Sequence, residues 1–132
     1  FVDGAADGAV RFLLFNNGAA PLRMWSSVDE YELHLGSGKC ELVWSFGPPC
    51  GHLGSFYSHH SSGVRRCPGS ANTLVTMGPQ GIVFEVTPEG EEVWRFICPV
   101  ETRRGQPAAV VRQGEQRGVG KFGLFFVQKY SE

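Results

Sequence analysis

The chain has 132 residues, a mass of 14.5 kDa and a formal net charge of -1 from 12 basic and 13 acidic residues. An apolar fraction of 42% with 12% aromatics predicts a globular protein with a hydrophobic core. The near-neutral charge argues against a general nucleic-acid or anionic-membrane binder, and no stretch approaches the roughly 18 apolar residues of a membrane span.

Glycine and proline, with 18 and 8 residues, divide the chain about every ten residues, which is the spacing of short antiparallel strands. No segment has a long helical pattern. The strands are expected at 10–15, 28–35, 40–46, 61–67, 73–77, 82–87, 91–97 and 122–130. Residues 101–118 are polar and glycine-rich, which predicts that most of this segment is loop. The pattern indicates an all-β fold with antiparallel sheets.

A hairpin pattern occurs twice in this series of strands. "GIVFEVTPEGEEVWRFICP" alternates apolar and polar residues on both sides of the turn "TPEG", and "VDEYELHLGSGKCELVWSFGPP" has the same order upstream. Trp44 and Trp94 are 50 positions apart, each in a Val-Trp-x-Phe sequence. The preceding apolar triplets, 13–15 and 74–76, are 61 apart, so the first copy carries extra residues around 19–27.

A repeat of about 40 to 50 residues with four short strands is typical of a β-propeller blade. The units are expected at 1–50, 51–100 and 101–132, which amounts to about two and a half four-stranded, blade-like sheets. Closed propellers have about four to eight blades, so this chain cannot close a ring alone. It is a fragment, it is completed by other chains, or its two packed sheets form a sandwich. The first residue, Phe1, favours a segment cut from a longer chain.

The cysteines and tryptophans have more than one explanation. Cys40, Cys50, Cys67 and Cys98 include no C-x-x-C pair, and they permit either two disulfides in an exported protein or isolated thiols packed in strands. Trp25, Trp44 and Trp94 are better explained by packing between blades than by a cofactor site. "CGHLGSFYSHH" offers a weaker zinc alternative through Cys50, His52, His59 and His60, although this spacing matches no established zinc pattern.

The segment "HHSSGVRRCPGSANTLVTMGPQGIVFEVTPEGEEVWRFICP" resembles the blade sequence of the bacterial arylsulfotransferase-like β-propellers. "RFLLFNNG", "SSVDEYEL" and the ending "GKFGLFFVQKYSE" are also similar to segments of that family. The resemblance is strong over 58–99 and weak over 101–120. It implies a propeller of the six-bladed type whose enzymes move a sulfuryl group between phenols through a transiently sulfated histidine, held by further histidines, an asparagine and an arginine.

The candidate site residues are His60, His59, Arg66, Arg65 and Asn72. A neutral imidazole can act as the nucleophile, and a cationic side chain can offset charge on the sulfuryl oxygens. Alternation along a strand places His60 and Arg66 on one face and His59 and Arg65 on the other. The simpler explanation is a pair of partly exposed loop histidines and solvated arginines.

The chain also departs from the family pattern. Residues 67–72 contain one extra residue in the turn before Asn72, Asn16 stands where the family has an aspartate, and the histidine expected before the first unit's turn is missing. A complete catalytic ring cannot be assembled from this chain.

Two classes of function follow. The first is a sulfotransferase-like enzyme that acts on a small aryl sulfate and a phenol, with no bound cofactor or metal. The second is a non-catalytic propeller module for interaction or scaffolding, whose partners are the remaining blades or another protein chain. The family's enzymes are typically exported, so the resemblance gives a weak preference for the periplasm or the extracellular space.

Overall fold

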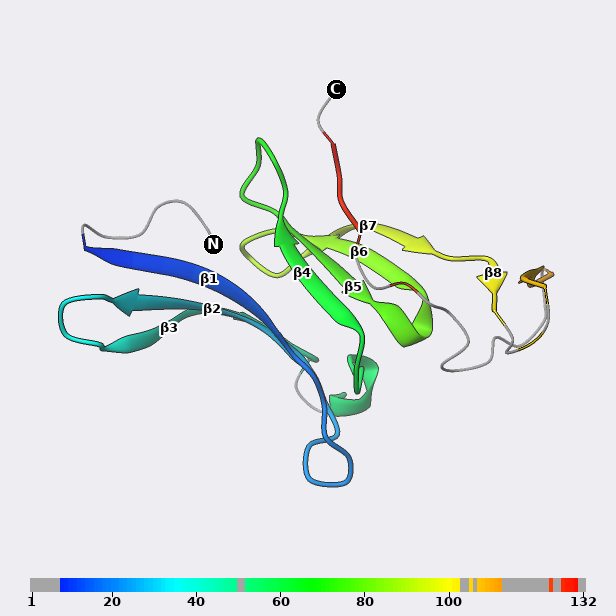
Figure 1. The fold of residues 1–132 in the computed structure, drawn as a ribbon, viewed down its shortest axis with the longest axis horizontal. Helices are drawn as coiled ribbons and strands as arrows, with labels where there is room; N and C mark the ends of the chain where they lie inside the picture. Colours follow the sequence, from blue (N-terminus) through cyan, green and yellow to red (C-terminus); the bar gives the residue numbers. More distant parts are fainter. Residues whose placement is uncertain are drawn as a thin grey trace. The chain divides into compact units, whose positions relative to one another are not determined.

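The structure is a computed structural model that describes residues 8–49, 52–102, 105, 107–112, 124 and 127–130. The chain divides into two compact units, Phe1–His59 and His60–Glu132, and each is described by itself. The described residues form antiparallel β-sheets and two short 3-10 turns (Figure 1). The expected all-β class is therefore confirmed, while no sheet among these residues closes on itself.

Unit 1 contains a three-stranded antiparallel sheet in the order β1-β2-β3. Its strands are β1 (Ala9–Asn16), β2 (Ser27–His34) and β3 (Cys40–Phe46), and the 3-10 turn η1 (Leu53–Ser55) follows them. The sheet has one strand fewer than a four-stranded blade among the described residues. Gly38 has a φ of 69° in the turn between β2 and β3, a conformation that glycine adopts without a steric penalty.

The core of unit 1 lies at the end of the sheet where β1 finishes. Phe56 is buried and lies edge-on against Phe15 and Phe46, with ring centroids 5.6 and 5.5 Å apart. The Ser26 hydroxyl accepts hydrogen bonds from the backbone N–H groups of Gly18 and Ser58 and donates one to the Ser58 carbonyl. These bonds join the segment after η1 to the loop between β1 and β2.

Unit 2 contains a four-stranded antiparallel sheet in the order β4-β5-β6-β7. Its strands are β4 (Ser62–Arg66), β5 (Thr73–Met77), β6 (Ile82–Val86) and β7 (Glu92–Ile97), and the 3-10 turn η2 (Gly78–Gln80) joins β5 to β6. On one face, Cys67, Leu74 and Val83 form a buried cluster against which Leu124 and Val127 pack. The expected TPEG turn is present between β6 and β7, with Gly90 at a φ of 86°.

The seven strands expected between residues 10 and 97 are all present, with ends shifted by at most one residue. Within the segment 101–118, expected to be mostly loop, Glu101 of β8 (Val100–Glu101) pairs with β9 (Ala109–Val110) in a small antiparallel ladder. The described part of the expected strand 122–130, residues 124 and 127–130, has no regular secondary structure. The rest of that segment lies outside the described residues.

The two main sheets share one arrangement of side chains across three neighbouring strands. In unit 1, Leu13 lies opposite Glu30, which lies opposite Trp44. The corresponding row in unit 2 is Leu74, Glu85 and Trp94. Each register then shifts directly beyond the glutamate, between Glu30 and Tyr31 and between Glu85 and Val86. The bulged residue is therefore the valine before each tryptophan.

The tryptophans of these rows differ in burial. Each stacks on the phenylalanine two residues later, with centroids 6.5 Å apart for Trp44 and Phe46 and 6.4 Å apart for Trp94 and Phe96. Trp44 is half-buried, whereas Trp94 is 49% exposed. Trp94 stands on the edge strand β7, whose six residues are all exposed, so its packing against a further blade stays a prediction. Among the described residues, no helix is long and apolar enough to cross a membrane.

Candidate functional site

The two candidate histidines lie just before β4, not on it. Ser61 has a φ of 50°, and the strand begins only at Ser62. The alternation that placed His60 with Arg66 and His59 with Arg65 therefore stops at Ser62, because a residue with positive φ breaks the extended backbone. Sequence reasoning missed this turn because a positive φ is uncommon for serine.

Both histidine side chains are exposed. The Ser61 hydroxyl oxygen lies 2.8 Å from Nδ1 of His60, so these two groups share a hydrogen bond. The ring of His59 stacks on Tyr57 with centroids 6.4 Å apart.

The arginines and Asn72 stand at the far end of β4. Arg66 Nη1 donates to the Ala71 carbonyl at 3.0 Å and to the Thr73 hydroxyl at 2.6 Å, and so braces the turn between β4 and β5. Arg65 lies opposite Leu74 in the sheet. At about 3.3 Å per residue, β4 spans about 13 Å from Ser62 to Arg66. His60 therefore precedes one end of this strand, while Arg66 stands at the other.

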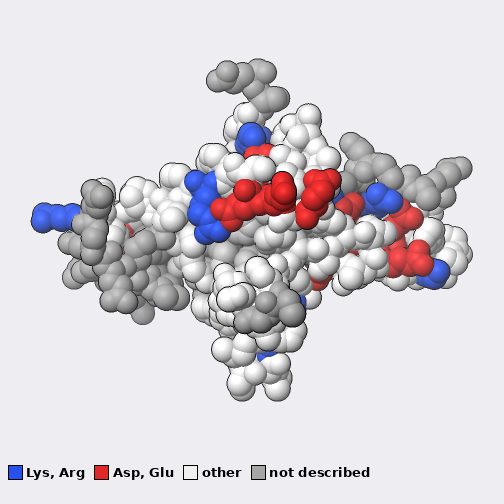
Figure 2. All heavy atoms as spheres, turned by 180° about the vertical axis from the view of Figure 1, so that it is seen from behind, with Lys and Arg blue, Asp and Glu red and all other residues white. Residues whose placement is uncertain are grey.

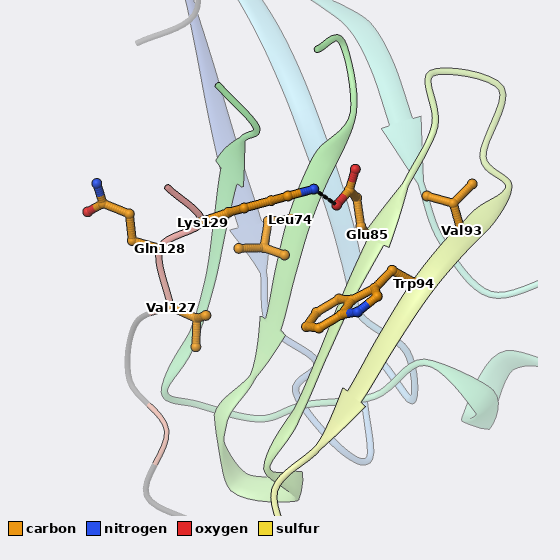
Figure 3. A pocket seen from close by; sticks show the side chains of 7 residues that line it. All are labelled: Leu74, Glu85, Val93, Trp94, Val127, Gln128 and Lys129. Atoms are coloured by element: carbon orange, nitrogen blue, oxygen red, sulfur yellow. Dashed lines mark hydrogen bonds and ion pairs between the residues drawn. The ribbon is translucent and has the colours of Figure 1, made fainter. Parts of the chain in front are cut away.

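Asn72 instead belongs to a polar group on the sheet of unit 2. Its Nδ2 donates to Glu85 Oε1 at 2.7 Å, and Lys129 Nζ donates to Glu85 Oε2 at 2.8 Å. These bonds join the β4–β5 turn and the C-terminal segment to the middle of β6. A cavity of about 470 Å³ lies beside this ion pair (Figure 3). Leu74, Glu85, Val93, Trp94, Val127, Gln128 and Lys129 line it.

The charges at the cavity stabilise one another. The hydrogen bond from Lys129, supported by the one from Asn72, holds the pKa of Glu85 below its ordinary value of 4.5. In return, the bond to Glu85 raises the pKa of Lys129 above 10.5. Burial, together with the nearby negative charge of Glu85, raises the pKa of the Cys67 thiol. At neutral pH the site therefore holds a carboxylate, an ammonium and a protonated thiol.

The bulge in β7 explains why two consecutive residues line the same cavity. In a regular strand, Val93 and Trp94 would point to opposite faces of the sheet. Val93 is the extra residue opposite the step from Glu85 to Val86, and a bulge of this kind re-aims side chains. Both side chains therefore contribute to the cavity wall.

Sequence reasoning missed Glu85 and Lys129. A charged residue within the apolar strand "IVFEV" indicates a buried carboxylate that needs a partner, and this signal was available. The sequence does not reveal which residue is that partner, because Lys129 is 44 residues away from Glu85 and no local pattern relates the two.

Charged side chains of both signs also meet on the sheet of unit 1. Arg11 Nε lies 2.7 Å from Glu32 Oε2, and His34 Nε2 lies 3.5 Å from carboxylate oxygens of both Glu32 and Glu41. Figure 2 shows acidic and basic side chains next to one another on the face that it presents.

In the described part of the chain, no three His, Cys, Asp or Glu residues form a metal-binding group. Cys50, from the alternative zinc set, lies outside that part.

No family model, curated protein or solved structure matches this chain.

Proposed function

We propose that the chain is a blade-bearing segment of an arylsulfotransferase-like β-propeller that acts as an interaction module, with a further sheet of the same type as its partner. The observation that carries the proposal is the apolar edge strand β7. Val93, Trp94, Phe96 and Ile97 are all about half exposed, and among the described residues no strand pairs with the outer edge of β7. Exposed apolar edges of this kind are sites of association unless another element covers them.

The repeated Leu-Glu-Trp row supports a partner of the blade type. A single sheet cannot bury both of its faces, so blade-like sheets are stable when they stack on neighbours. Leu124 and Val127 already pack on Cys67, Leu74 and Val83, while Trp94 and Phe96 remain half exposed. A further sheet would also bury the exposed side chains of β7. In the isolated chain, a second copy of the same chain can provide that sheet.

Sedimentation velocity over a wide concentration range tests this proposal. We expect reversible self-association of the wild-type chain and its loss in Phe96→Lys, because a lysine on an edge strand opposes pairing and burial. Glu91→Lys is the matched control, since Glu91 is exposed in the turn before β7. Circular dichroism checks that both variants fold. A wild-type chain that stays monomeric throughout, or Phe96→Lys that associates like wild type, would contradict the proposal.

Sulfuryl transfer from an aryl sulfate to a phenol is the second candidate. The contact between Ser61 Oγ and His60 Nδ1 favours it, because a hydrogen bond at one ring nitrogen orients an imidazole. In this mechanism, His60 attacks sulfur, the phenolate leaves, and a phenolic acceptor takes the sulfuryl group from the histidine. The separation of His60 from Arg66 makes this candidate the weaker one.

Incubation of the protein with nitrophenyl sulfate tests the second candidate. Release of nitrophenol with a sulfated histidine, both abolished in His60→Ala, is the result it predicts. His59→Ala serves as the neighbouring control and should retain most of the signal. Phenol release that survives the double variant His59→Ala/His60→Ala would rule out these residues as the nucleophile.

A further inference from the structure

The cavity beside Glu85 has the size and chemical character of a small-ligand site. Its volume of about 470 Å³ falls within the roughly 300–1,000 Å³ of such sites, which are mostly apolar with a few fixed polar groups. The apolar lining residues are Leu74, Val93, Trp94 and Val127, and the polar ones are Glu85, Gln128 and Lys129. All of these residues belong to unit 2.

Glu85 is the fixed polar group of the cavity. Its side chain is only 7% exposed, and Asn72 holds one of its oxygens from the turn between β4 and β5. A buried carboxylate is costly without a positive partner, so the site requires a cation next to the other oxygen. The protein itself supplies that cation as the ammonium of Lys129.

Lys129 is the exchangeable group of the cavity. Its side chain is 57% exposed, and residues 127–130 belong to no strand. In the view of Figure 3, its aliphatic stem passes Leu74 and its ammonium meets the Glu85 carboxylate. The occupant that the cavity already accepts is therefore a primary amine on an apolar stem.

Trp94 provides a cavity wall that also suits a primary amine on an apolar stem. The β7 bulge places the indole and Val93 at the cavity, next to the Glu85 carboxylate. The face of an indole ring attracts cations and also packs well against flat apolar groups.

We propose that this cavity is a binding site for an apolar primary amine, whose ammonium replaces that of Lys129 on the Glu85 carboxylate while its apolar group packs on Trp94. An anion does not fit equally well, because it would lie close to the negative charge of the buried Glu85. This inference does not depend on the proposed interaction or transferase function.

Calorimetric titration with 2-phenylethylamine tests the site, with wild type compared to Lys129→Ala. The tethered lysine competes with the free amine at an effective concentration on the order of mM, so its removal should tighten amine binding by about tenfold or more. Lys129→Arg is the control that retains the competing charge and should bind as weakly as wild type. Glu85→Gln introduced into Lys129→Ala should abolish binding.

Two ligand controls need no further variant. On Lys129→Ala, the uncharged 2-phenylethanol and the anionic phenylacetate should each bind at least about tenfold more weakly than the amine, as expected when a charged hydrogen bond is lost. Equal binding of 2-phenylethanol would show an apolar cavity without amine recognition and would overturn the proposal. Tighter binding of phenylacetate to wild type, or amine binding unchanged by Lys129→Ala, would also overturn it.

Discussion

At the scale of single residues, the ion pair of Glu85 and Lys129 ties the C-terminal segment to the sheet of unit 2. Because the pKa of Glu85 is lowered from 4.5, the pair stabilises the fold above about pH 4.5, and this stabilisation is lost as the pH falls through the folded-state pKa. The raised pKa of Lys129 gives the opposite limit, since the stabilisation is complete below pH 10.5 and is lost as the pH rises through the folded-state value.

Lys129→Met should therefore flatten the acid side of the stability profile. We expect the free energy of unfolding, measured by urea titration at several pH values, to fall less steeply below pH 4.5 in this variant than in wild type. Lys129→Arg keeps the charge and should retain the wild-type slope. Identical acid slopes for Lys129→Met and wild type would show that the pair does not contribute to stability.

Gly78 is a second single residue on which the sheet of unit 2 depends. A Cβ at this position would collide with the backbone carbonyl oxygens of both Ser61 and Leu124, and backbone atoms cannot rotate out of the way. Gly78→Ala should therefore destabilise the chain by about 3 kcal/mol, at the upper end of the cost of overpacking.

Gly36→Ala is the matched control for Gly78→Ala, because a Cβ at Gly36 meets no atom within 4 Å. Thermal unfolding should therefore show a large loss of stability for Gly78→Ala. The free energy of unfolding of Gly36→Ala should change by no more than about 0.5 kcal/mol. Equal midpoints of thermal unfolding for the two variants would show that position 78 has room for a Cβ, in contradiction to the structure.

At the scale of elements, the tryptophans of the repeated row should contribute unequally to stability. Trp44 is half-buried and stacks on Phe46, which contacts the buried Phe56, whereas Trp94 is 49% exposed. We expect Trp94→Ala to cost about 1–2 kcal/mol, less than the about 3–5 kcal/mol of a fully buried aromatic residue, and Trp44→Ala to cost more than Trp94→Ala. Denaturant titration measures both, and a larger loss for Trp94→Ala would contradict the described packing.

The strands were predictable from sequence because their signals are local. Alternating side chains and the glycine at position 90 define β6, β7 and their turn, and the 50-residue spacing of Trp44 and Trp94 matches the shared register of the two sheets. The positive φ of Ser61 was not predictable, and it moves both histidines off β4. The partner of Glu85 was not predictable either, because that contact depends on how a distant segment folds back on the sheet.

At the scale of the whole molecule, the chain divides into two compact units, and the edge strand β7 of the second unit exposes apolar side chains. The sequence predicted that these sheets are too few to close a propeller ring, which remains a prediction. The proposed role of β7 is to provide a surface for a further sheet of the same type. That role concerns particular side chains, so the measurement must locate the contact as well as detect association.

Hydroxyl-radical footprinting at low and high protein concentration makes this measurement most directly. We predict that oxidation of Trp94 and Phe96 falls several-fold at high concentration, because a second sheet covers them, while oxidation of Leu22, which is 91% exposed on a loop of unit 1, stays the same. Oxidation of Trp94 that remains unchanged at concentrations where sedimentation shows association would place the contact elsewhere and contradict the account.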